Sequence, residues 1–258
     1  MRVATWNVNS VRARLPRLLP WLAEVRPEVV CLQETKVIDE LFPREPIEEL
    51  GYECALHGRK TYNGVAILSR VGIEDVQRGM QDDEGEDERR IISADCGGVQ
   101  VVCCYVINGQ EVGAPRYHDK LRWLHRLTGR LERTVDTRDE KVLVVGDFNV
   151  TFDDRDVWDP ERWRDRILCS QPEREALGEV LESLALHDAY RELHPEPGGF
   201  TWWDFRSFAW KKDRGLRIDH ILASQPALEA LREVVVDRAA RDGEKPSDHA
   251  PVIASLEV

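Results

Sequence analysis

Short apolar and alternating runs recur along the whole chain, at lengths typical of β-strands. The run at residues 142–146 is apolar almost throughout, which favours a fully buried central strand. Together the runs predict strands at residues 3–6, 29–32, 52–57, 64–69, 91–95, 99–107, 142–146, 218–222, 234–237 and 251–256.

Three stretches between these runs carry leucine and valine at helical spacing. The first covers residues 15–25, where Pro16 and Pro20 are expected to confine the regular part of the helix. The other two follow Pro115 and Pro172, residues suited to the first turn of a helix. Helices and strands alternate without long parallel βαβ regularity, and several neighbouring strands are joined by short turns. This favours an α/β layer architecture with mixed sheets.

Two stretches have no regular pattern. Residues 81–88 are almost wholly acidic and predict a solvated loop, and residues 151–165 carry five aspartates and two tryptophans. The chain has no low-complexity linker and no convincing internal repeat, so we expect one catalytic domain over residues 1–258.

The overall composition indicates a folded, acidic protein. With 258 residues, a hydrophobic share of 42% and eight tryptophans, the chain can form a substantial core. The net charge of −12 argues against a nucleic-acid coat protein and against binding to an anionic membrane surface. It does not exclude a nuclease, because a local basic groove is sufficient to steer DNA.

The cysteines and the apolar runs indicate the compartment. The six cysteines show no C-x-x-C spacing and no histidine at zinc-ligand spacing, which is typical of buried free thiols in a reducing cytosol. The N-terminus has no charged-then-apolar signal region, and no apolar run approaches the roughly 18 residues that span a bilayer. We therefore expect a soluble, cytoplasmic protein without membrane contact, and a monomer.

Acids and amides follow several of the predicted strands. Glu34 lies two positions after residue 32, at or just past the end of the strand predicted at residues 29–32, and Asn7 directly follows residues 3–6. Side chains at such strand ends commonly bind ligands, and a carboxylate there suits Mg²⁺. The alternatives are a surface glutamate for Glu34 and a turn or helix-capping residue for Asn7.

The segment G-D-F-N at residues 146–149 ends the most apolar run. In an extended chain, Asp147 and Asn149 project to the same side. One carboxylate could then orient or deprotonate a water while the amide donates to a phosphate oxygen. A turn-forming D-x-N sequence is the alternative.

His249 and Asp219 are candidates for a paired imidazole and carboxylate. His249 lies between Asp248 and the final strand, and Asp219 lies in another strand. A carboxylate bonded to an imidazole fixes its tautomer and can keep it protonated beside a phosphate. A structural histidine is the alternative, and Tyr105 within residues 99–107 has the alternative of a packed core tyrosine.

In this order, the motifs make the chain resemble the exonuclease III family of abasic-site DNA endonucleases, within the endonuclease/exonuclease/phosphatase superfamily. The similarity extends from A-T-W-N at residues 4–7 to S-D-H-A-P-V at residues 247–252. Three further segments resemble the DNA-repair branch specifically, at residues 200–206, 213–219 and 244–249. The resemblance implies a four-layered α-β-β-α sandwich, in which two mixed β-sheets pack face to face with the active site at one rim.

The resemblance also assigns roles around a divalent metal, Mg²⁺ or Mn²⁺. Glu34 would bind the ion with Asn7 nearby, and Asp248 would tune the metal site. A second metal environment would include Asn9. Asp147 would align or activate the attacking water.

The remaining roles that the resemblance implies concern the phosphate and the DNA. Asn149 and the His249–Asp219 pair would contact the phosphate, and Tyr105 and Asn108 would contact the phosphate or the leaving group. The pattern Tyr-x-Pro-Asn common in the family is Y-V-I-N here, which relaxes the backbone without removing a functional side chain. The DNA-binding residues would be a sugar pocket of Trp202, Leu216 and Ile218, with Trp210, Lys211 and Arg214 along the strand.

Holding DNA on an acidic chain requires local cations, and basic residues flank the motifs. Each alone has the alternative of a solvated surface charge, but residues 202–217 interleave aromatic and basic side chains as nucleic-acid-binding segments do. Structural roles are expected for Trp203 and Phe205. The basic candidates are Lys36, Arg59, Lys60, Arg89, Arg90, Arg116, Lys211, Lys212, Arg214, Arg217 and Lys245.

The leading hypothesis is a Mg²⁺-dependent DNA repair nuclease. It would hydrolyse the phosphodiester 5′ to abasic sites in double-stranded DNA, with 3′→5′ exonuclease and 3′-phosphatase or phosphodiesterase activity in addition. The first alternative is a superfamily phosphodiesterase or phosphatase acting on RNA, nucleotides, or inositol or lipid phosphates. The second is a DNA-binding relative without catalysis, which would lack a metal ligand or the imidazole.

Overall fold

The computed structural model describes residues 1–83, 85 and 88–257. Within this part of the chain, the strands form two mixed six-stranded sheets, each with one central parallel pair and antiparallel strands on both sides. The first sheet has the order β11 (Leu231–Val236), β12 (Val252–Leu256), β1 (Arg2–Asn7), β2 (Val29–Gln33), β4 (Val65–Ser69) and β3 (Glu53–His57). The second has the order β5 (Glu74–Arg78), β6 (Ile91–Asp95), β7 (Gln100–Tyr105), β8 (Val142–Asp147), β10 (Asp219–Ala223) and β9 (His187–Asp188).

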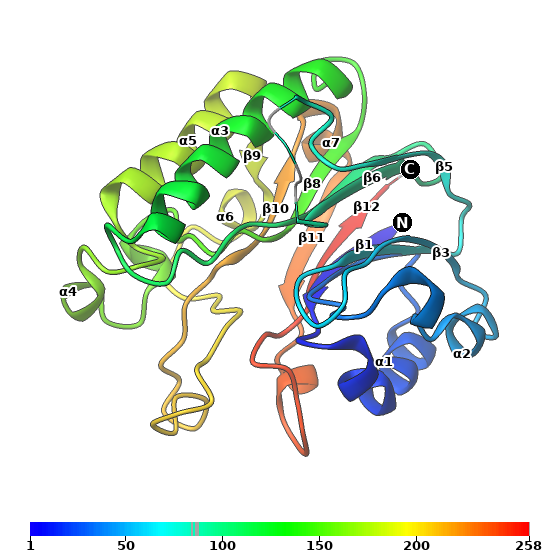
Figure 1. Cartoon of the computed structure of the whole chain (residues 1–258), viewed down its shortest axis with the longest axis horizontal. Helices are drawn as coiled ribbons and strands as arrows, with labels where there is room; N and C mark the ends of the chain where they lie inside the picture. The colour runs from blue at the N-terminus through cyan, green and yellow to red at the C-terminus, as the bar shows by residue number, and fades with distance from the viewer. Residues whose placement is uncertain (84, 86–87, 258) are drawn as a thin grey trace.

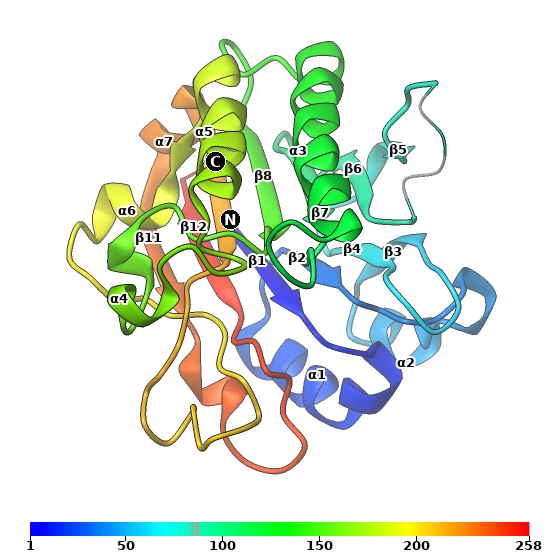
Figure 2. The ribbon, with the colours of Figure 1, turned by 60° about the vertical axis from the view of Figure 1, so that its left-hand side comes forward.

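Helices cover the outer faces of both sheets, as Figure 1 shows. The first sheet is covered by α1 and α2, and the second by α3 and α5 (Figures 1 and 2). The helices are α1 (Val11–Val25), α2 (Arg44–Glu48), α3 (Pro115–Thr134), α4 (Pro160–Trp163), α5 (Gln171–Leu184), α6 (Ala189–Leu193) and α7 (Gln225–Ala230), with the 3₁₀ turns η1 (Asp39–Leu41), η2 (Asp154–Asp156) and η3 (Arg238–Arg241).

The apolar core lies in three layers, which confirms the predicted four-layered sandwich. Successive strand residues point to opposite faces, so Cys103 packs between the sheets and Cys104 packs under α3 and α5. Val3, Cys31 and Val145 join Cys103 in the layer between the sheets. All six cysteines are free thiols and five are buried, as expected. No helix in the described residues is long and apolar enough to cross a membrane.

Helix α5 begins at Gln171, which confirms the helix predicted after Pro172. Ser170 and Glu173 form a reciprocal capping box, and Pro172 occupies the first turn, where its missing N–H costs no hydrogen bond. Leu177, Val180 and Leu184 are buried on the face toward the sheet. The helix ends at Ala185 in the left-handed conformation.

The prediction that Pro16 and Pro20 confine the first helix is wrong. Helix α1 continues through both residues from Val11 to Val25. The two prolines are four residues apart and exposed, so the backbone carbonyls that lose a helical partner remain near solvent. The buried side chains of the opposite face hold the helix against the sheet; these are Val11, Leu18, Trp21 and Leu22.

The two stretches without a regular pattern contain more structure than predicted. Residues 151–165 include η2 and α4. In the acidic loop at residues 81–88, Asp82 accepts from Arg126 at 2.9 Å and Glu88 accepts from Arg116 at 2.8 Å, so α3 binds both ends of the loop. Residues 84, 86 and 87 of this loop lie outside the described residues. The pattern also missed β5, β9, α2, α6 and α7, which are short or largely polar.

Candidate active site

Six strands meet at one edge of the sandwich. The parallel strands β1, β2, β7 and β8 all end there, while their antiparallel neighbours β12 and β10 begin there. The register pairs Asp147 with both Tyr105 and Asp219, and the residues that follow β1 and β2 lie at the same edge of the facing sheet. Polar side chains from distant parts of the sequence are therefore brought together.

The buried amide of Asn7 connects the two sheets. Its Nδ2 donates to Glu34 Oε1 and to Asp147 Oδ2, both at 2.8 Å. Its Oδ1 accepts from the backbone N–H of Asn9 at 3.0 Å, which fixes the orientation of the amide. Two carboxylates that repel one another are thus held on one donor group.

Asp147 and Asn149 form a tight turn at the end of β8. Asp147 Oδ1 accepts from the backbone N–H of Asn149 at 2.9 Å, and Asn149 has the left-handed conformation at φ 51° that asparagine tolerates. The alternative of a D-x-N turn is therefore compatible with a role for Asp147 in binding water. Its Oδ1 closes the turn, while its Oδ2 faces Asn7. Burial, together with the charge of Asp219, raises the pKa of Asp147 to about 7, although His249 opposes the shift.

His249 is paired with Asp219, as predicted. Its Nδ1 donates to Asp219 Oδ2 at 2.8 Å and Oδ1 at 3.1 Å, and its Nε2 lies 3.7 Å from Asp147 Oδ2. Thr201 Oγ1 donates to Asp219 Oδ2 at 2.6 Å, which leaves that carboxylate fixed in place. Burial alone would lower the pKa of His249, but Asp219 and Asp147 outweigh it and raise the pKa to about 10. The imidazole is therefore cationic at neutral pH.

Glu34 belongs to a second network of hydrogen bonds and ion pairs. Lys36 Nζ lies 2.6 Å from Glu34 Oε2 and donates to Asn9 Oδ1 at 2.6 Å. Asn9 Nδ2 donates to Asp248 Oδ1, and Trp202 Nε1 donates to Asp248 Oδ2, both at 3.0 Å. Burial alone would raise the pKa of Asp248, but His249 and these two donors lower it. Asp248 is thus connected to Glu34 through Asn9 and Lys36.

The donor set fits a divalent cation such as Mg²⁺. Carboxylate oxygens are the ligands that this ion prefers, and Glu34 and Asp147 converge on Asn7. Asp147 and Asp219 each place a carboxylate oxygen within 4.8 Å of the other and of one His249 nitrogen, so two buried acids lie close together here. Burial is the main cause of the raised pKa of Asp147 and the charge of Asp219 adds to it, and a bound cation would oppose both effects.

Tyr105 and Asn108 lie on the same edge. Tyr105 ends β7 and is 9% exposed, with the guanidinium of Arg90 4.6 Å above its ring. Burial and the negative charge of Glu34 raise the pKa of Tyr105 well above its ordinary value, so the phenol is neutral. The exposed Asn108 donates to Asn149 Oδ1 at 3.0 Å.

The three residues predicted to form a sugar pocket belong to one apolar cluster beside His249. Trp202 pairs through its backbone with both Leu216 and His249. Leu216 and Ile218 are completely buried beneath it in one apolar cluster, so Trp202 is the partly exposed member of the three. The interleaved segment therefore places one aromatic surface next to the His249–Asp219 pair.

The rest of that segment forms a projecting loop, at the lower edge of Figures 1 and 2 beside the loop that follows η3. Lys211 is exposed at this loop, while Arg214 lies 4.8 Å over the ring of Trp158. Trp210 packs against the buried Trp203 at 4.7 Å, so the structural role expected for Trp203 is confirmed. Phe205 is 54% exposed and lies outside the core, with the guanidinium of Arg241 5.1 Å over its ring.

Arg217 and Arg90 were wrong candidates for DNA binding, because both are buried. The clearer case is Arg217. Its side chain is 1% exposed and forms ion pairs with Asp156 and Asp188 at 2.7 and 2.6 Å. Sequence spacing cannot distinguish a buried arginine from an exposed one. Thr201 and Lys36 were not recognised as supports of the site, although Thr201 lies within the segment at residues 200–206 and Lys36 is among the basic candidates.

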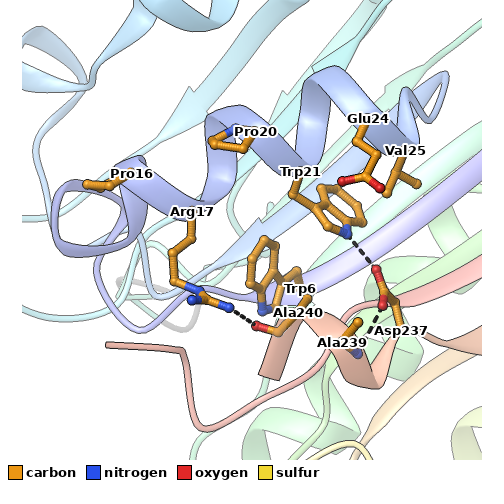
Figure 3. Close-up of a pocket in the computed structure, with 10 residues that line it drawn as sticks. All are labelled: Trp6, Pro16, Arg17, Pro20, Trp21, Glu24, Val25, Asp237, Ala239 and Ala240. Carbon is orange, nitrogen blue, oxygen red and sulfur yellow. Dashed lines mark hydrogen bonds between the residues drawn. The ribbon is translucent and has the colours of Figure 1, made fainter. Parts of the chain in front are cut away.

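Helix α1 anchors the segment that leads to His249 (Figure 3). Trp21 Nε1 donates to Asp237 Oδ2 at 2.7 Å, and Arg17 Nη2 donates to the Ala240 carbonyl at 3.0 Å. Trp6, which packs on Trp21, donates to the His249 carbonyl at 3.1 Å. A pocket of about 370 Å³ lies between α1 and η3 at this anchor.

Comparison with known proteins agrees with this geometry. Residues 4–249 match the model of the Endonuclease/Exonuclease/phosphatase family, and the chain belongs to that family. Exodeoxyribonuclease III of Haemophilus influenzae is 36% identical over 268 residues, which cover 99% of this chain and 100% of the relative.

Two solved structures match over 100% of both chains with a TM-score of 0.96. One is the 3′ phosphatase NExo from Neisseria bound to a product DNA hairpin, at 40% identity, and the other is an AP endonuclease from Archaeoglobus fulgidus, at 37%. The predicted resemblance is confirmed, and the chain is a hydrolytic nuclease.

Proposed function

We propose that this DNA repair nuclease hydrolyses the phosphodiester on the 5′ side of an abasic site in double-stranded DNA, and also processes 3′ ends. The observation that carries the proposal is the joining of Glu34, Asp147 and the His249–Asp219 pair at one edge, beside the apolar surface of Trp202. The names of the relatives support both activities, since they include an AP endonuclease and a 3′ phosphatase.

In this reaction water adds to phosphorus and the bond from phosphorus to the 3′ oxygen breaks. The products are a 3′-hydroxyl and a 5′-phosphate on the abasic sugar. Asp147 accepts a proton from the water or orients it, which suits a carboxylate whose pKa is raised to about 7. His249 donates through Nε2 to a phosphate oxygen while Asp219 holds the ring.

The amides and the phenol would complete the phosphate site. Asn149 uses one amide hydrogen on the Val106 carbonyl at 3.0 Å, which leaves the second for a phosphate oxygen. Tyr105 keeps its proton and donates to the phosphate or to the leaving oxygen. Asn108 orients Asn149 from the outside.

Glu34 would hold the divalent ion, Mg²⁺ or Mn²⁺, with Asn7 and Asp248 nearby. When bound, the ion supplies positive charge that neutralises the phosphate and favours departure of the leaving group. Lys36 limits the negative charge of Glu34 and keeps its carboxylate oriented.

Abasic-site preference would come from the partly exposed Trp202, with the buried Leu216 and Ile218 packed against it as support. A sugar without a base fits an apolar surface, whereas a normal nucleotide must first be flipped out at a cost of a few kcal/mol. Trp210, Lys211 and Arg214 would contact the duplex from the projecting loop. The two sheets share one core layer, which supports the further proposal that residues 1–258 act as one catalytic domain. We also propose that the protein acts as a monomer in the cytoplasm.

Cleavage of end-labelled duplex DNA with a single abasic analogue tests the proposal. An undamaged duplex with a recessed 3′ end is the parallel substrate, and each is incubated with Mg²⁺, with Mn²⁺ or with EDTA. We expect nicking at the lesion that EDTA abolishes, and shortening of the 3′ end at a different rate. Failure to cleave either substrate while still binding the abasic duplex would overturn the proposal in favour of RNA, nucleotide or inositol phosphates.

A further inference from the structure

An ion pair between Lys120 of α3 and Glu173 of α5 lies directly behind the phosphate-facing loops. Both side chains have zero exposure. Lys120 Nζ donates to the Asn149 carbonyl at 2.6 Å and to the Asn108 carbonyl at 3.2 Å, and Glu173 Oε1 is its third partner. Its three hydrogens therefore connect the loop after β7, the loop after β8 and helix α5.

Glu173 is itself fixed at the start of α5. It accepts from the backbone N–H of Leu168 at 3.0 Å, and from the N–H and hydroxyl of Ser170 at 3.1 and 2.6 Å. Tyr117 of α3 is within 2.8 Å of the same hydroxyl. The carboxylate thus anchors Lys120 to a rigid helix terminus rather than to a mobile side chain.

A buried ion pair is a poor way to gain stability, because desolvation offsets most of the attraction between the charges. Burial lowers the pKa of Lys120, and Glu173 opposes that shift. What an ammonium offers here, and an apolar side chain does not, is three directed donors. Two of them bind the backbone of residues whose side chains, Asn108 and Asn149, are already bonded to one another at 3.0 Å.

We propose that Lys120 is a positioning residue for phosphodiester hydrolysis, which sets the Asn108–Asn149 pair at the distance that the scissile phosphate requires. The proposal rests on the proposed function for its catalytic consequence. Lys120 touches no substrate and acts through the two backbone carbonyls. Loss of Lys120 should therefore lower kcat more than it changes KM, because the Asn108–Asn149 pair lies at the scissile phosphate rather than along the flanking duplex.

The test compares Lys120→Met with the double variant Lys120→Met/Glu173→Gln and the control Arg130→Met. Arg130 is equally buried on α3, bonded to the Gly79 carbonyl and Ser93 at 2.8 and 2.9 Å. It lies ten residues further along the helix, about 15 Å away. Each variant is measured for melting temperature, for kcat and KM on the abasic duplex, and for backbone hydrogen exchange.

We expect Lys120→Met to lower kcat by about 10- to 100-fold with KM changed by less than about threefold. Exchange at residues 106–110 and 148–151 should speed up in this variant and stay unchanged in Arg130→Met. The double variant no longer buries a negative charge without its cation, so its melting temperature should rise above that of Lys120→Met while its kcat stays low.

Recovery of kcat together with the melting temperature would overturn the proposal, and so would an equal loss of kcat in Arg130→Met. Unchanged exchange in the two loops would overturn it as well. If the wild-type protein does not cleave the abasic duplex, the proposed function fails, while hydrogen exchange still decides whether Lys120 holds the loops.

Discussion

Asn7 illustrates how one neutral side chain organises the charges of this site. Glu34 and Asp147 come from different sheets, and each accepts from the same amide nitrogen at 2.8 Å. The amide adds no charge that would balance the two acids. Burial and the charge of Asp219 therefore still raise the pKa of Asp147 to about 7. A cation and a phosphate-binding imidazolium both suit such a site.

At the residue scale, replacing Asp219 by asparagine tests the orientation of His249. The imidazole loses the carboxylate that fixes its tautomer and stabilises its charge. We expect kcat on the abasic duplex to fall on the order of 10²- to 10⁴-fold, with little change in KM. Asp95→Asn is the control, because Asp95 lies at the opposite end of its sheet. Wild-type kcat in Asp219→Asn would contradict the assigned pairing.

Sequence motifs located the principal side chains but not their supports. Glu34, Asp147, Asp219 and His249 were predicted from strand ends, and the structure brings them together. Thr201, which holds Asp219 at 2.6 Å, gave no chemical signal of its own. Its role depends on a partner 18 residues away, and hydrogen bonds at that separation are set by the fold rather than by local pattern.

At the element scale, β7 and β8 approach so closely that Gly146 has no substitute. It has φ 150°, and an added Cβ would lie 1.9 Å from the Cys104 carbonyl oxygen. Gly146→Ala should destabilise the protein by about 2–4 kcal/mol in urea unfolding. Gly178→Ala, in α5 with nothing within 4 Å, should instead stabilise by about 0.5–1 kcal/mol. Equal effects of the two changes would contradict this account.

The ion-pair network of Asp156 connects η2, α6 and β9, and its contribution depends on pH. Burial alone would raise the pKa of Asp156, but Arg217 and Arg191 outweigh it and lower the pKa to about 2. Folding therefore favours the ionised form above the ordinary value of 3.8, and this stabilisation disappears as the pH falls through 2.

We expect Asp156→Asn to lose about 2–3 kcal/mol of unfolding free energy at neutral pH, and progressively less as the pH falls below about 4. Urea unfolding of both proteins at several pH values measures the difference. A difference that is constant with pH would show that Asp156 contributes through packing rather than through its charge.

At the scale of the whole molecule, the net charge and the local charge act in opposite directions. The chain carries a net charge of −12, yet Lys211, Lys212 and Lys245 are exposed on the two loops that flank the site. DNA affinity should therefore depend on a few local cations and fall steeply with added salt.

Replacing Lys211 and Lys212 together by alanine should reduce the slope of log Kd against log salt by about 1–2, because each phosphate contact releases about one counterion. Affinity for the abasic duplex, measured in EDTA over a range of KCl, gives the slope. Lys141→Ala is the control, since Lys141 precedes β8 at the far end of the sheet. An unchanged slope in the double variant would place the DNA elsewhere.

The pattern of apolar and polar residues by itself determined most strands and the three long helices, because these elements depend on neighbours within a few residues. The motifs and their order were also legible in the sequence alone. Short polar elements such as α6 and β9 lacked that periodicity. Only the tertiary structure decided that Arg217 is buried in ion pairs and that Lys120 binds two loops from behind. Both outcomes depend on strand order and register, which bring together residues that are distant in the sequence.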